Sequence, residues 1–224
     1  MNYLKQLFPF YNEYHKINHT NQGIKYSTFL LHKIKSVLGI NKVYWQPVKT
    51  CRVGMPKRLY IGKNSNVIRE YNFLQCSGGV WIGDYVEFAT RVSLLSSNHD
   101  LYDQRISHKK PIRIGDYSWL GMHSTVLAGV ELGPRTIVAN GAVVTKSFPE
   151  GLCVLAGVPA KVVKKLDGQK FVRWKEKYEY YGYIEANKFE SSPHYIVKRY
   201  LDSTIFKIKD DKIILLPDYY IEEK

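Results

Sequence analysis

The sequence predicts an all-β solenoid, because an aliphatic residue recurs at every sixth position over six consecutive units. These residues are Ile114, Leu120, Val126, Leu132, Val138 and Val144. A period of six fits neither the 3.6-residue turn of a helix nor the alternation of an ordinary strand, so each unit is expected to be a short strand plus a corner, stacked as a parallel solenoid. The second position of the unit is mostly small, as at Gly115, Gly121 and Gly133, and is expected to permit a tight corner.

The same register continues upstream with two interruptions. Three units are expected at Ile61, Val67 and Phe73, and three more, after a short insertion at residues 77–79, at Ile82, Phe88 and Leu94. Twenty residues instead of six then separate Leu94 from Ile114. A loop over residues 97–111 is therefore expected to leave the stack, and loops on a rigid repeat scaffold commonly carry function.

Residues 1–58 are expected to form a basic, partly helical N-terminal extension. Through residue 60 the chain holds ten Lys and Arg residues against the single acid Glu13, a balance of 10 − 1 = +9 out of the total of +13. The stretch 26–40 has the apolar and basic spacing of an amphipathic helix. Such a helix could rest on an acidic membrane surface or steer a polyanionic substrate, but packing against the protein with its lysines in solvent is favoured. Basicity alone is not specific for nucleic acid, and no recognised nucleic-acid module is present.

Residues 167–224 are expected to form a C-terminal extension beyond the repeat domain of residues 59–166. A short helix is expected within residues 167–182. The apolar alternation of residues 204–216 about Asp210 and Asp211 predicts a β-hairpin. This extension is expected to cover an end or side of the solenoid, since open strand edges need blunting. The nearby tyrosines could stack on sugar rings, but a packing role is favoured; they are Tyr178, Tyr180, Tyr181 and Tyr183.

The cysteine content and hydropathy favour a cytoplasmic protein, at most associated with the inner face of the membrane. Cys51, Cys76 and Cys153 are odd in number and show no CxxC spacing, which argues for a reducing compartment. No run of about 18 apolar residues is present, and the N-terminus lacks the pattern of a signal peptide. An apolar content of 45% is ordinary for a globular protein.

The run IGDYSWLGMHSTVLAGVELGPRTIVANGAVVTK, followed by AGVPAKVVKKL, resembles the hexapeptide-repeat acyltransferases. Within that family it is most similar to the galactoside, maltose and polysaccharide O-acetyltransferases, over about residues 59–166. The resemblance implies a left-handed parallel β-helix, an exception to the usual right-handed crossover. It also implies acetyl-CoA as acyl donor and a homotrimer with active sites between subunits.

The resemblance assigns the catalytic base to His99. In the family the matching histidine follows the Ile of an Ile-Gly-Asp unit by seventeen residues, as His99 follows Ile82 here. A neutral imidazole can take the proton of an alcohol as its oxygen attacks a thioester carbonyl. An isolated loop histidine would more simply be a solvated side chain, and the surrounding repeat favours catalysis.

Two further positions are implied by the same resemblance. Trp119 matches a tryptophan that borders the acyl and pantetheine channel, although core or interface packing would also explain it. Met122 matches a residue whose backbone N–H faces the developing oxyanion, a role that needs only the amide. Most related sequences carry a small polar residue there, so a hydroxyl contribution is missing.

A coenzyme site is implied at seven positions. They are Asn140, Gly141, Ala142, Thr145, Lys146, Lys161 and Lys164. The small residues at 141 and 142 would let an extended pantetheine arm lie against the coil. Lys161 and Lys164 could neutralise phosphate where many family members have arginine, so charge is kept and bidentate geometry is lost. A solvated basic face is the alternative for both lysines.

A metal site is not expected. His99, His108 and His123 could suggest the three-histidine metal site of a related hexapeptide-repeat branch, but the close histidine pair of that branch is missing. His123 falls at a position expected to face outward, and His108 lies in the loop, where it could touch the acceptor.

The sequence therefore predicts an O-acetyltransferase that acts on a sugar hydroxyl of a cell-surface polysaccharide or its lipid-linked precursor. The basic N-terminal extension suits a substrate assembled at an acidic membrane face. A sugar-nucleotide or xenobiotic acetyltransferase is the alternative enzyme, and a non-catalytic solenoid scaffold is the alternative of a different class.

Overall fold

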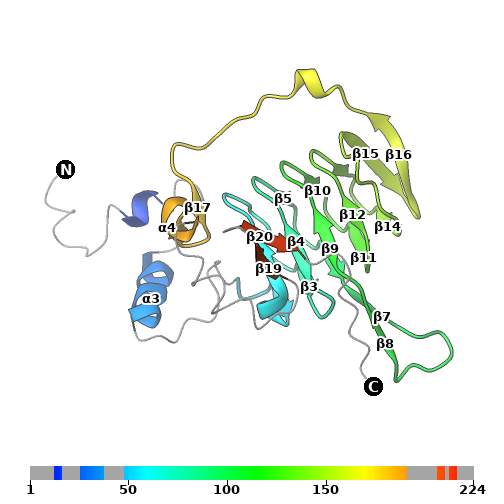
Figure 1. Ribbon diagram of the computed structural model, residues 1–224, viewed down its shortest axis with the longest axis horizontal. Helices are drawn as coiled ribbons and strands as arrows, with labels where there is room; N and C mark the ends of the chain where they lie inside the picture. The colour runs from blue at the N-terminus through cyan, green and yellow to red at the C-terminus, as the bar shows by residue number, and fades with distance from the viewer. Residues whose placement is uncertain (1–12, 17–25, 38–47, 191–205, 210–211, 216–224) are drawn as a thin grey trace, which may run out of the picture.

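The protein is built around a three-sided parallel β-solenoid (Figure 1). The computed structural model describes residues 13–16, 26–37, 48–190, 206–209 and 212–215. Strands β1 to β15, apart from the pair β7 and β8, form three parallel sheets that run along the three sides. The predicted parallel solenoid is thereby confirmed.

Each sheet collects one strand from successive coils. Sheet A has the order β1-β3-β6-β11-β14, from Arg52–Gly54, Phe73–Gln75, Ser93–Leu95, Thr125–Leu127 and Val143–Val144. Sheet B has the order β12-β9-β4-β2, from Glu131–Leu132, Ile112–Ile114, Val80–Ile82 and Leu59–Ile61. Sheet C has the order β16-β15-β13-β10-β5, from Ala160–Lys165, Cys153–Gly157, Ile137–Val138, Trp119–Leu120 and Glu87–Phe88. A 3₁₀ turn, Pro56–Arg58, links β1 to β2. Because β1 pairs with β3, the stack begins before residue 59.

The recurring aliphatic residues form the core. All six from Ile114 to Val144 are at most 1% exposed. Small side chains at the fifth position of the unit also point inward, and Ser118, Ser124 and Thr136 are almost fully buried. Burial of the aliphatic ladder removes its apolar surface from water, at roughly 25 cal/mol per Å².

The upstream register differs from the prediction at one strand. Leu74 is fully buried, whereas the expected core residue Phe73 is 41% exposed. The cause is one extra residue between Asn66 and Phe73, which pair with Glu87 and Ser93 of the next coil. The buried side chain of Asn72 in this stretch donates to the Val67 carbonyl and accepts from the Val92 amide. Because successive strand residues point to opposite faces, this insertion turns Phe73 outward.

Close stacking of the coils explains the glycines at the second position. A Cβ on Gly62 would lie 2.4 Å from the Gly83 backbone, and one on Gly115 would lie 2.4 Å from the nitrogen of Pro134. The prediction that small residues at this position permit a tight corner is confirmed at both glycines. The positive φ falls two residues later, at Asn64 and Tyr117. Glycine is needed for space.

The corner between sheets B and C is a ladder of outward side chains in left-handed backbone conformation. They are Asn64, Tyr85, Tyr117, Arg135 and Leu152, with φ from 48° to 57°. Beside them, the Asp84 carboxylate accepts from the Lys63 amide and the Asp116 carboxylate from the Asp84 amide, each at 2.9 Å. Side chains of one coil therefore cap the backbone of the coil before it.

A segment that we name the strap, residues 167–180, returns along this corner toward the first coil (Figure 1). The guanidinium of Arg135 lies over the rings of Tyr117 and Phe171 at 4.7 and 4.3 Å. The ring of Trp174 packs edge-on against Tyr85, with centroids 4.8 Å apart. The helix expected over 167–182 is not formed, because after the 3₁₀ turn Gly168–Lys170 the strap makes its contacts with the ladder instead of with itself.

The end of the strap covers the first coil. Asn64 exchanges three hydrogen bonds with Tyr178 and Tyr180, at 2.8 to 3.0 Å. The strands β17 (Tyr180–Tyr181) and β18 (Ile184–Glu185) and the helix α4 (Ala186–Glu190) follow. The ring of Tyr181 stacks on Phe189 at 4.1 Å, and both join the solenoid core. The C-terminal extension thus covers one end of the stack, as predicted, and three of the four tyrosines are buried.

The amphipathic helix predicted in the N-terminal extension is confirmed as α3, Tyr26–Val37. Phe29 is fully buried against Tyr180 and Tyr183, while Leu31 and Ile34 are about half exposed. A helical turn at residues 13–16 packs Tyr14 against Tyr26. Residues 38–40 of the predicted helix lie outside the described residues.

The predicted C-terminal hairpin is confirmed by antiparallel pairing of β19 (Phe206–Lys209) with β20 (Lys212–Leu215). Its expected turn at Asp210 and Asp211 lies outside the described residues. Within the described part of the chain, no helix is long and apolar enough to span a membrane.

The partly buried corner carboxylate of Asp84 predicts a measurable pH dependence of stability. Burial raises its pKa to about 6, a rise opposed by the hydrogen bond from the Lys63 amide. Because the folded pKa exceeds the value of about 3.9 for an unfolded chain, this group stabilises the fold below about pH 4, and the contribution is lost as pH rises through about 6.

Substitution Asp84→Asn keeps an acceptor for the Lys63 amide and removes the titrating charge. Urea unfolding is therefore expected to show a smaller loss of stability between about pH 4 and pH 7.5 in the variant than in the wild type. Equal pH dependence in the two proteins would contradict the assignment of this titration to Asp84.

Candidate active site

The predicted excursion loop is a β-hairpin that projects from the stack (Figure 1). Strands β7 (Ser97–His99) and β8 (Ser107–Lys109) pair antiparallel, with Asn98 opposite His108. An aspartate-rich turn joins them: the Asp100 carboxylate accepts from the amides of Tyr102 and Asp103 at 2.8 and 3.0 Å. The hairpin is therefore an ordered arm.

Buried polar contacts fix the root of the hairpin to the solenoid. Ser96 is fully buried, and its hydroxyl donates to the Gln75 carbonyl and accepts from the Gly78 amide. Its carbonyl accepts from the Lys110 amide at 3.0 Å, which closes the root. The side chain of Gln75 also bonds the amide and the hydroxyl of Ser97. These contacts set the direction in which β7 leaves sheet A.

His99 ends β7, and the backbone orients its imidazole. Its Nδ1 lies 2.7 Å from the Gln104 carbonyl oxygen across the hairpin. A carbonyl can only accept a hydrogen bond, so Nδ1 donates, and in the neutral imidazole Nε2 then carries the lone pair. The exposed ring therefore presents a basic nitrogen to solvent. Sequence reasoning missed Gln104, because a backbone carbonyl leaves no signal in the residue type.

A second histidine of the hairpin is held by a carboxylate. His108 Nε2 lies 2.9 Å from the Asp100 carboxylate. That hydrogen bond, with those from the Asp103 and Tyr102 amides, lowers the pKa of Asp100 to about 2. Asp100 is therefore ionised at neutral pH and braces the hairpin next to His99.

A groove of about 570 Å³ connects the hairpin with sheet A. His99, Asp100 and His108 line one side, and Leu127 and Thr145 lie on the other. Thr145, a predicted coenzyme contact, thus shares a groove with the predicted base in one chain. The volume lies within the range of roughly 300–1,000 Å³ typical of small-ligand sites.

Trp119 lies elsewhere, on the outer face of sheet C. It is 52% exposed, pairs with Glu87 and Ile137 in β5 and β13, and lines a second groove of about 420 Å³ beside the strap. The grooves at His99 and Trp119 have no lining residue in common. One chain therefore does not bring these two predicted residues together.

Met122 and Asn140 meet at the corner between sheets C and A. The Met122 amide donates to the Asn140 side-chain oxygen at 2.8 Å, just as the Asp84 amide donates to Asp116 at the corner between B and C. The predicted oxyanion donor is thus engaged in a corner contact, and Asn140 has a structural role. His123 is exposed at this same corner.

The other predicted coenzyme residues differ in exposure. Gly141 has φ of +70° and open space around its Cα. Ala142 is 1% exposed, and its amide and carbonyl are bonded to Ala139 and Thr125. Lys146 is exposed, with its amine 5.7 Å from the Phe148 ring centroid. These placements leave the predicted roles at 140–146 as predictions.

Lys161 and Lys164 lie on β16, the antiparallel strand that closes sheet C. They pair with Ala156 and Val154 of β15, and both side chains are exposed. Lys164 also lines a pocket of about 320 Å³ with Lys165 and Lys170. This edge can attract phosphate, as predicted for the nucleotide end of the coenzyme.

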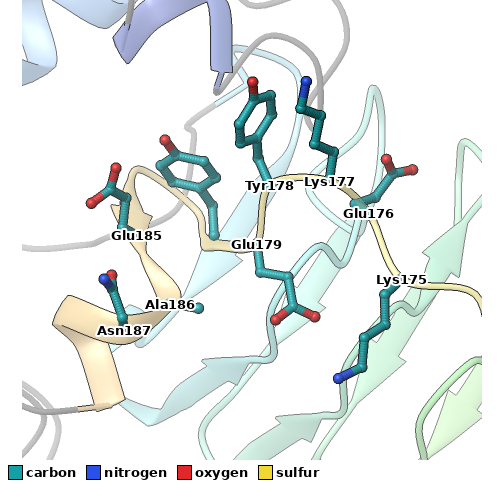
Figure 2. Close-up of a pocket in the computed structure, with 9 residues that line it drawn as sticks. Lys175, Glu176, Lys177, Tyr178, Glu179, Glu185, Ala186 and Asn187 are labelled. Carbon is teal, nitrogen blue, oxygen red and sulfur yellow. The ribbon is translucent and has the colours of Figure 1, made fainter.

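A further pocket, of about 330 Å³, lies where the strap meets β17, β18 and α4 (Figure 2). Its charged side chains have both signs, among them Lys175, Lys177 and Glu185, and it shares no residue with the groove at His99. In the described part of the chain, no three His, Cys, Asp or Glu side chains are clustered as metal ligands would be. The expectation of a metal-free site stays a prediction.

Comparison with known proteins agrees with the repeat. Residues 111–146 match the family model "Bacterial transferase hexapeptide (six repeats)". Galactoside O-acetyltransferase of Escherichia coli (strain K12) is 28% identical over 129 residues, 56% of this chain and 59% of that protein. WbbJ of the same strain, named as a candidate O-acetyl transferase of lipopolysaccharide biosynthesis, is 32% identical over 111 residues, 44% of this chain and 56% of that protein. The matches thus span less than two thirds of the length of these relatives.

A solved galactoside acetyltransferase in complex with coenzyme A shares the fold. The TM-score is 0.54 at 21% identity, over 74% of this chain and 84% of that one. The predicted left-handed parallel β-helix of hexapeptide repeats is thereby confirmed. The chain thus carries the hexapeptide repeat of bacterial transferases, shares the fold of this solved acetyltransferase, and is similar in sequence to acetyltransferases over part of their length.

Proposed function

We propose that the protein transfers an acetyl group from acetyl-CoA to a sugar hydroxyl, with His99 as general base. The observation that carries this proposal is the 2.7 Å contact between His99 Nδ1 and the Gln104 carbonyl. In the neutral imidazole this contact leaves the lone pair on Nε2, in a groove large enough for a sugar and an acyl thioester. The named activities of the relatives, O-acetyl transfer to galactosides above all, support the same chemistry.

The proposed reaction proceeds by direct attack. His99 Nε2 takes the proton of the acceptor hydroxyl as its oxygen bonds to the thioester carbonyl carbon. The C–S bond then breaks, and the thiolate of coenzyme A leaves with the proton returned by the imidazolium. The hydrogen bond to Gln104 holds the ring in one tautomer throughout. The Met122 amide would have to release Asn140 before it could bind the oxyanion.

A second copy of the chain is proposed to complete the site. His99 and Trp119 project from different sheets into different grooves, so a coenzyme that meets both must bridge two solenoids. The proposed assembly is a homotrimer, in which His99 of one copy faces Trp119 and Lys161 of the next. Lys161 and Lys164 would then hold the phosphates of the donor.

The proposed acceptor is a surface polysaccharide or its lipid-linked precursor at the cytoplasmic face of the membrane. The net charge of +13, of which +9 falls within residues 1–60, suits an acidic membrane face. The two half-exposed apolar residues of α3 suit the same contact. The name of WbbJ, which refers to lipopolysaccharide biosynthesis, supports a glycan acceptor.

Loss of the proposed base should abolish turnover. Thiol release from acetyl-CoA is measured with a panel of sugars, sugar nucleotides and purified surface glycans. His99→Ala is expected to lower kcat with the best acceptor by about 10² to 10⁴.

The matched control is His123→Asn, which removes an exposed histidine at another corner and keeps a residue that tolerates the positive φ of 59°. It is expected to retain wild-type kcat. Turnover by His99→Ala equal to that of the control would contradict the proposed mechanism.

The lysines of β16 should act on donor affinity. Lys161→Ala and Lys164→Ala are each expected to raise KM for acetyl-CoA about three- to tenfold with kcat unchanged, and less so at high salt. Lys188→Ala is the control, because this exposed lysine of α4 pairs with Glu185 and does not line the pocket at Lys164. A solvated basic face without function predicts the same KM in all three variants.

The proposed assembly can be measured directly. Size-exclusion chromatography with light scattering is expected to give the mass of three chains, about 78 kDa from a chain of 26.0 kDa. Mixed trimers of His99→Ala and Trp119→Ala chains should regain part of the activity. In some of their sites, an intact His99 from one copy then faces an intact Trp119 from the next. A fully active monomer would exclude a shared site.

A further inference from the structure

The turn that orients His99 is itself held by one side chain, Asp100. One oxygen of the Asp100 carboxylate accepts from the amides of Tyr102 and Asp103 at 2.8 and 3.0 Å. The other oxygen lies 2.9 Å from Nε2 of His108 on the opposite strand. An ionised carboxylate only accepts, and it has room for about four hydrogen bonds, so His108 donates and all three contacts are made together. Asp100 therefore ties the turn to strand β8.

The same turn places the Gln104 carbonyl. The Ile106 amide donates to the Asp103 carbonyl at 2.9 Å, and the Asp100 amide donates to the Ile106 carbonyl at 3.0 Å. Gln104 lies inside this closed turn, and its carbonyl oxygen is 2.7 Å from Nδ1 of His99. A continuous series of contacts therefore leads from the Asp100 side chain through the turn to the imidazole of His99.

The ion pair of Asp100 and His108 adds little to the stability of the fold. The two side chains are 29% and 56% exposed, and exposed pairs are weak because water and salt screen them. The root of the hairpin is held separately by the buried hydroxyl of Ser96 and its contacts with the neighbouring coil. Loss of the pair is therefore expected to leave the protein folded and to change only the turn beside His99.

That turn decides whether the imidazole of His99 can act as a base. A neutral imidazole has two tautomers, and only the one with its proton on Nδ1 leaves a lone pair on Nε2. The ring is exposed, and the contact with the Gln104 carbonyl selects this tautomer. Because misplacement of a catalytic group by about 1 Å can cost about 10² in rate, order in the turn matters for turnover.

We propose that Asp100 and His108 are positioning residues for His99. His108 holds the Asp100 carboxylate, Asp100 holds the turn, and the turn keeps the base in its Nδ1–H tautomer. The inference rests on the proposed function in taking His99 as the general base, and it adds what keeps that base ready. His108 also lines the groove, so the competing role for it is direct contact with the acceptor.

The tautomer of His99 can be measured in the free, full-length protein. Histidine is labelled with ¹⁵N, long-range proton–nitrogen spectra are recorded at about pH 8, where an ordinary histidine is neutral, and the His99 signals are assigned by their loss in His99→Ala. The wild type is expected to show the Nδ1–H tautomer. His108→Leu, which removes the donor to Asp100, should move part of the population to Nε2–H. Asp100→Ala, which removes the acceptor of all three contacts, should move more.

The conservative variant His108→Gln tests the hydrogen bond itself. Its amide nitrogen can donate to Asp100 from about the place of Nε2, so it should keep the wild-type tautomer. In turnover, His108→Leu is expected to lower kcat about tenfold with KM for the acceptor unchanged, and His108→Gln should recover most of that loss. A raised KM for the acceptor at constant kcat would overturn the proposal and assign His108 to acceptor binding.

The matched control is Tyr102→Ala, which removes a 97% exposed side chain from the same turn and keeps the amide that donates to Asp100. It should retain the tautomer and kcat of the wild type, and circular dichroism should show that all variants are folded. A wild type without the Nδ1–H tautomer is incompatible with the proposal. So is a His108→Leu spectrum equal to that of the control.

The two readouts separate the positioning pair from the proposed reaction. A His99 tautomer that depends on His108 supports the pair even if no acceptor is acetylated, and that outcome counts against the reaction alone. Turnover that depends on His99 and is unchanged in His108→Leu supports the reaction and overturns the positioning pair.

Discussion

The close stacking of successive coils at their corners is the constraint on which the rest of the structure depends. At the corner between sheets B and C the backbones approach so closely that a Cβ on Gly83 would lie 2.2 Å from the Asp116 carboxylate. That same carboxylate caps the amide of Asp84. Gly83 in one coil and the capping Asp116 in the next therefore meet the same requirement. The backbone amides at the corner must be paired while the aliphatic residues of neighbouring coils stay in contact.

This constraint decides which side chains remain for function. Within a coil, every second residue faces a core that admits only aliphatic or small side chains, and the glycines can carry no chemistry. Residues in the left-handed corner conformation point outward and form ladders. One ladder, with Tyr85 and Tyr117, receives the strap. The hairpin leaves from another corner, where buried Ser96 bonds neighbouring coils in place of an aliphatic contact. Functional side chains are therefore confined to the corners, to the outer faces of the sheets, and to segments that leave the stack, such as the hairpin.

Much of the fold and part of the site could be predicted from the sequence. The hexad identified the solenoid, its core ladder and the excursion, because the aliphatic period is a local property. The register failed at Phe73, since this coil holds one extra residue between Asn66 and Phe73, and the hydrogen bonds of Asn72 stabilise the longer corner against the next coil. His99 was found through its spacing from Ile82, but its orienting partner was not, because the Gln104 carbonyl comes within reach only when β7 and β8 pair.

The sequence by itself determined the repeat, the charge asymmetry and the resemblance to hexapeptide-repeat acyltransferases, because all three depend on residue type and spacing. Tertiary structure decided which of the predicted site residues lie in contact. It engaged the Met122 amide with Asn140, separated Trp119 from His99 on different sheets, and brought Trp174 back across the length of the stack to line the groove at Trp119. These outcomes depend on contacts between residues many coils apart, and such contacts are set by the stacking of the solenoid, which no local pattern encodes.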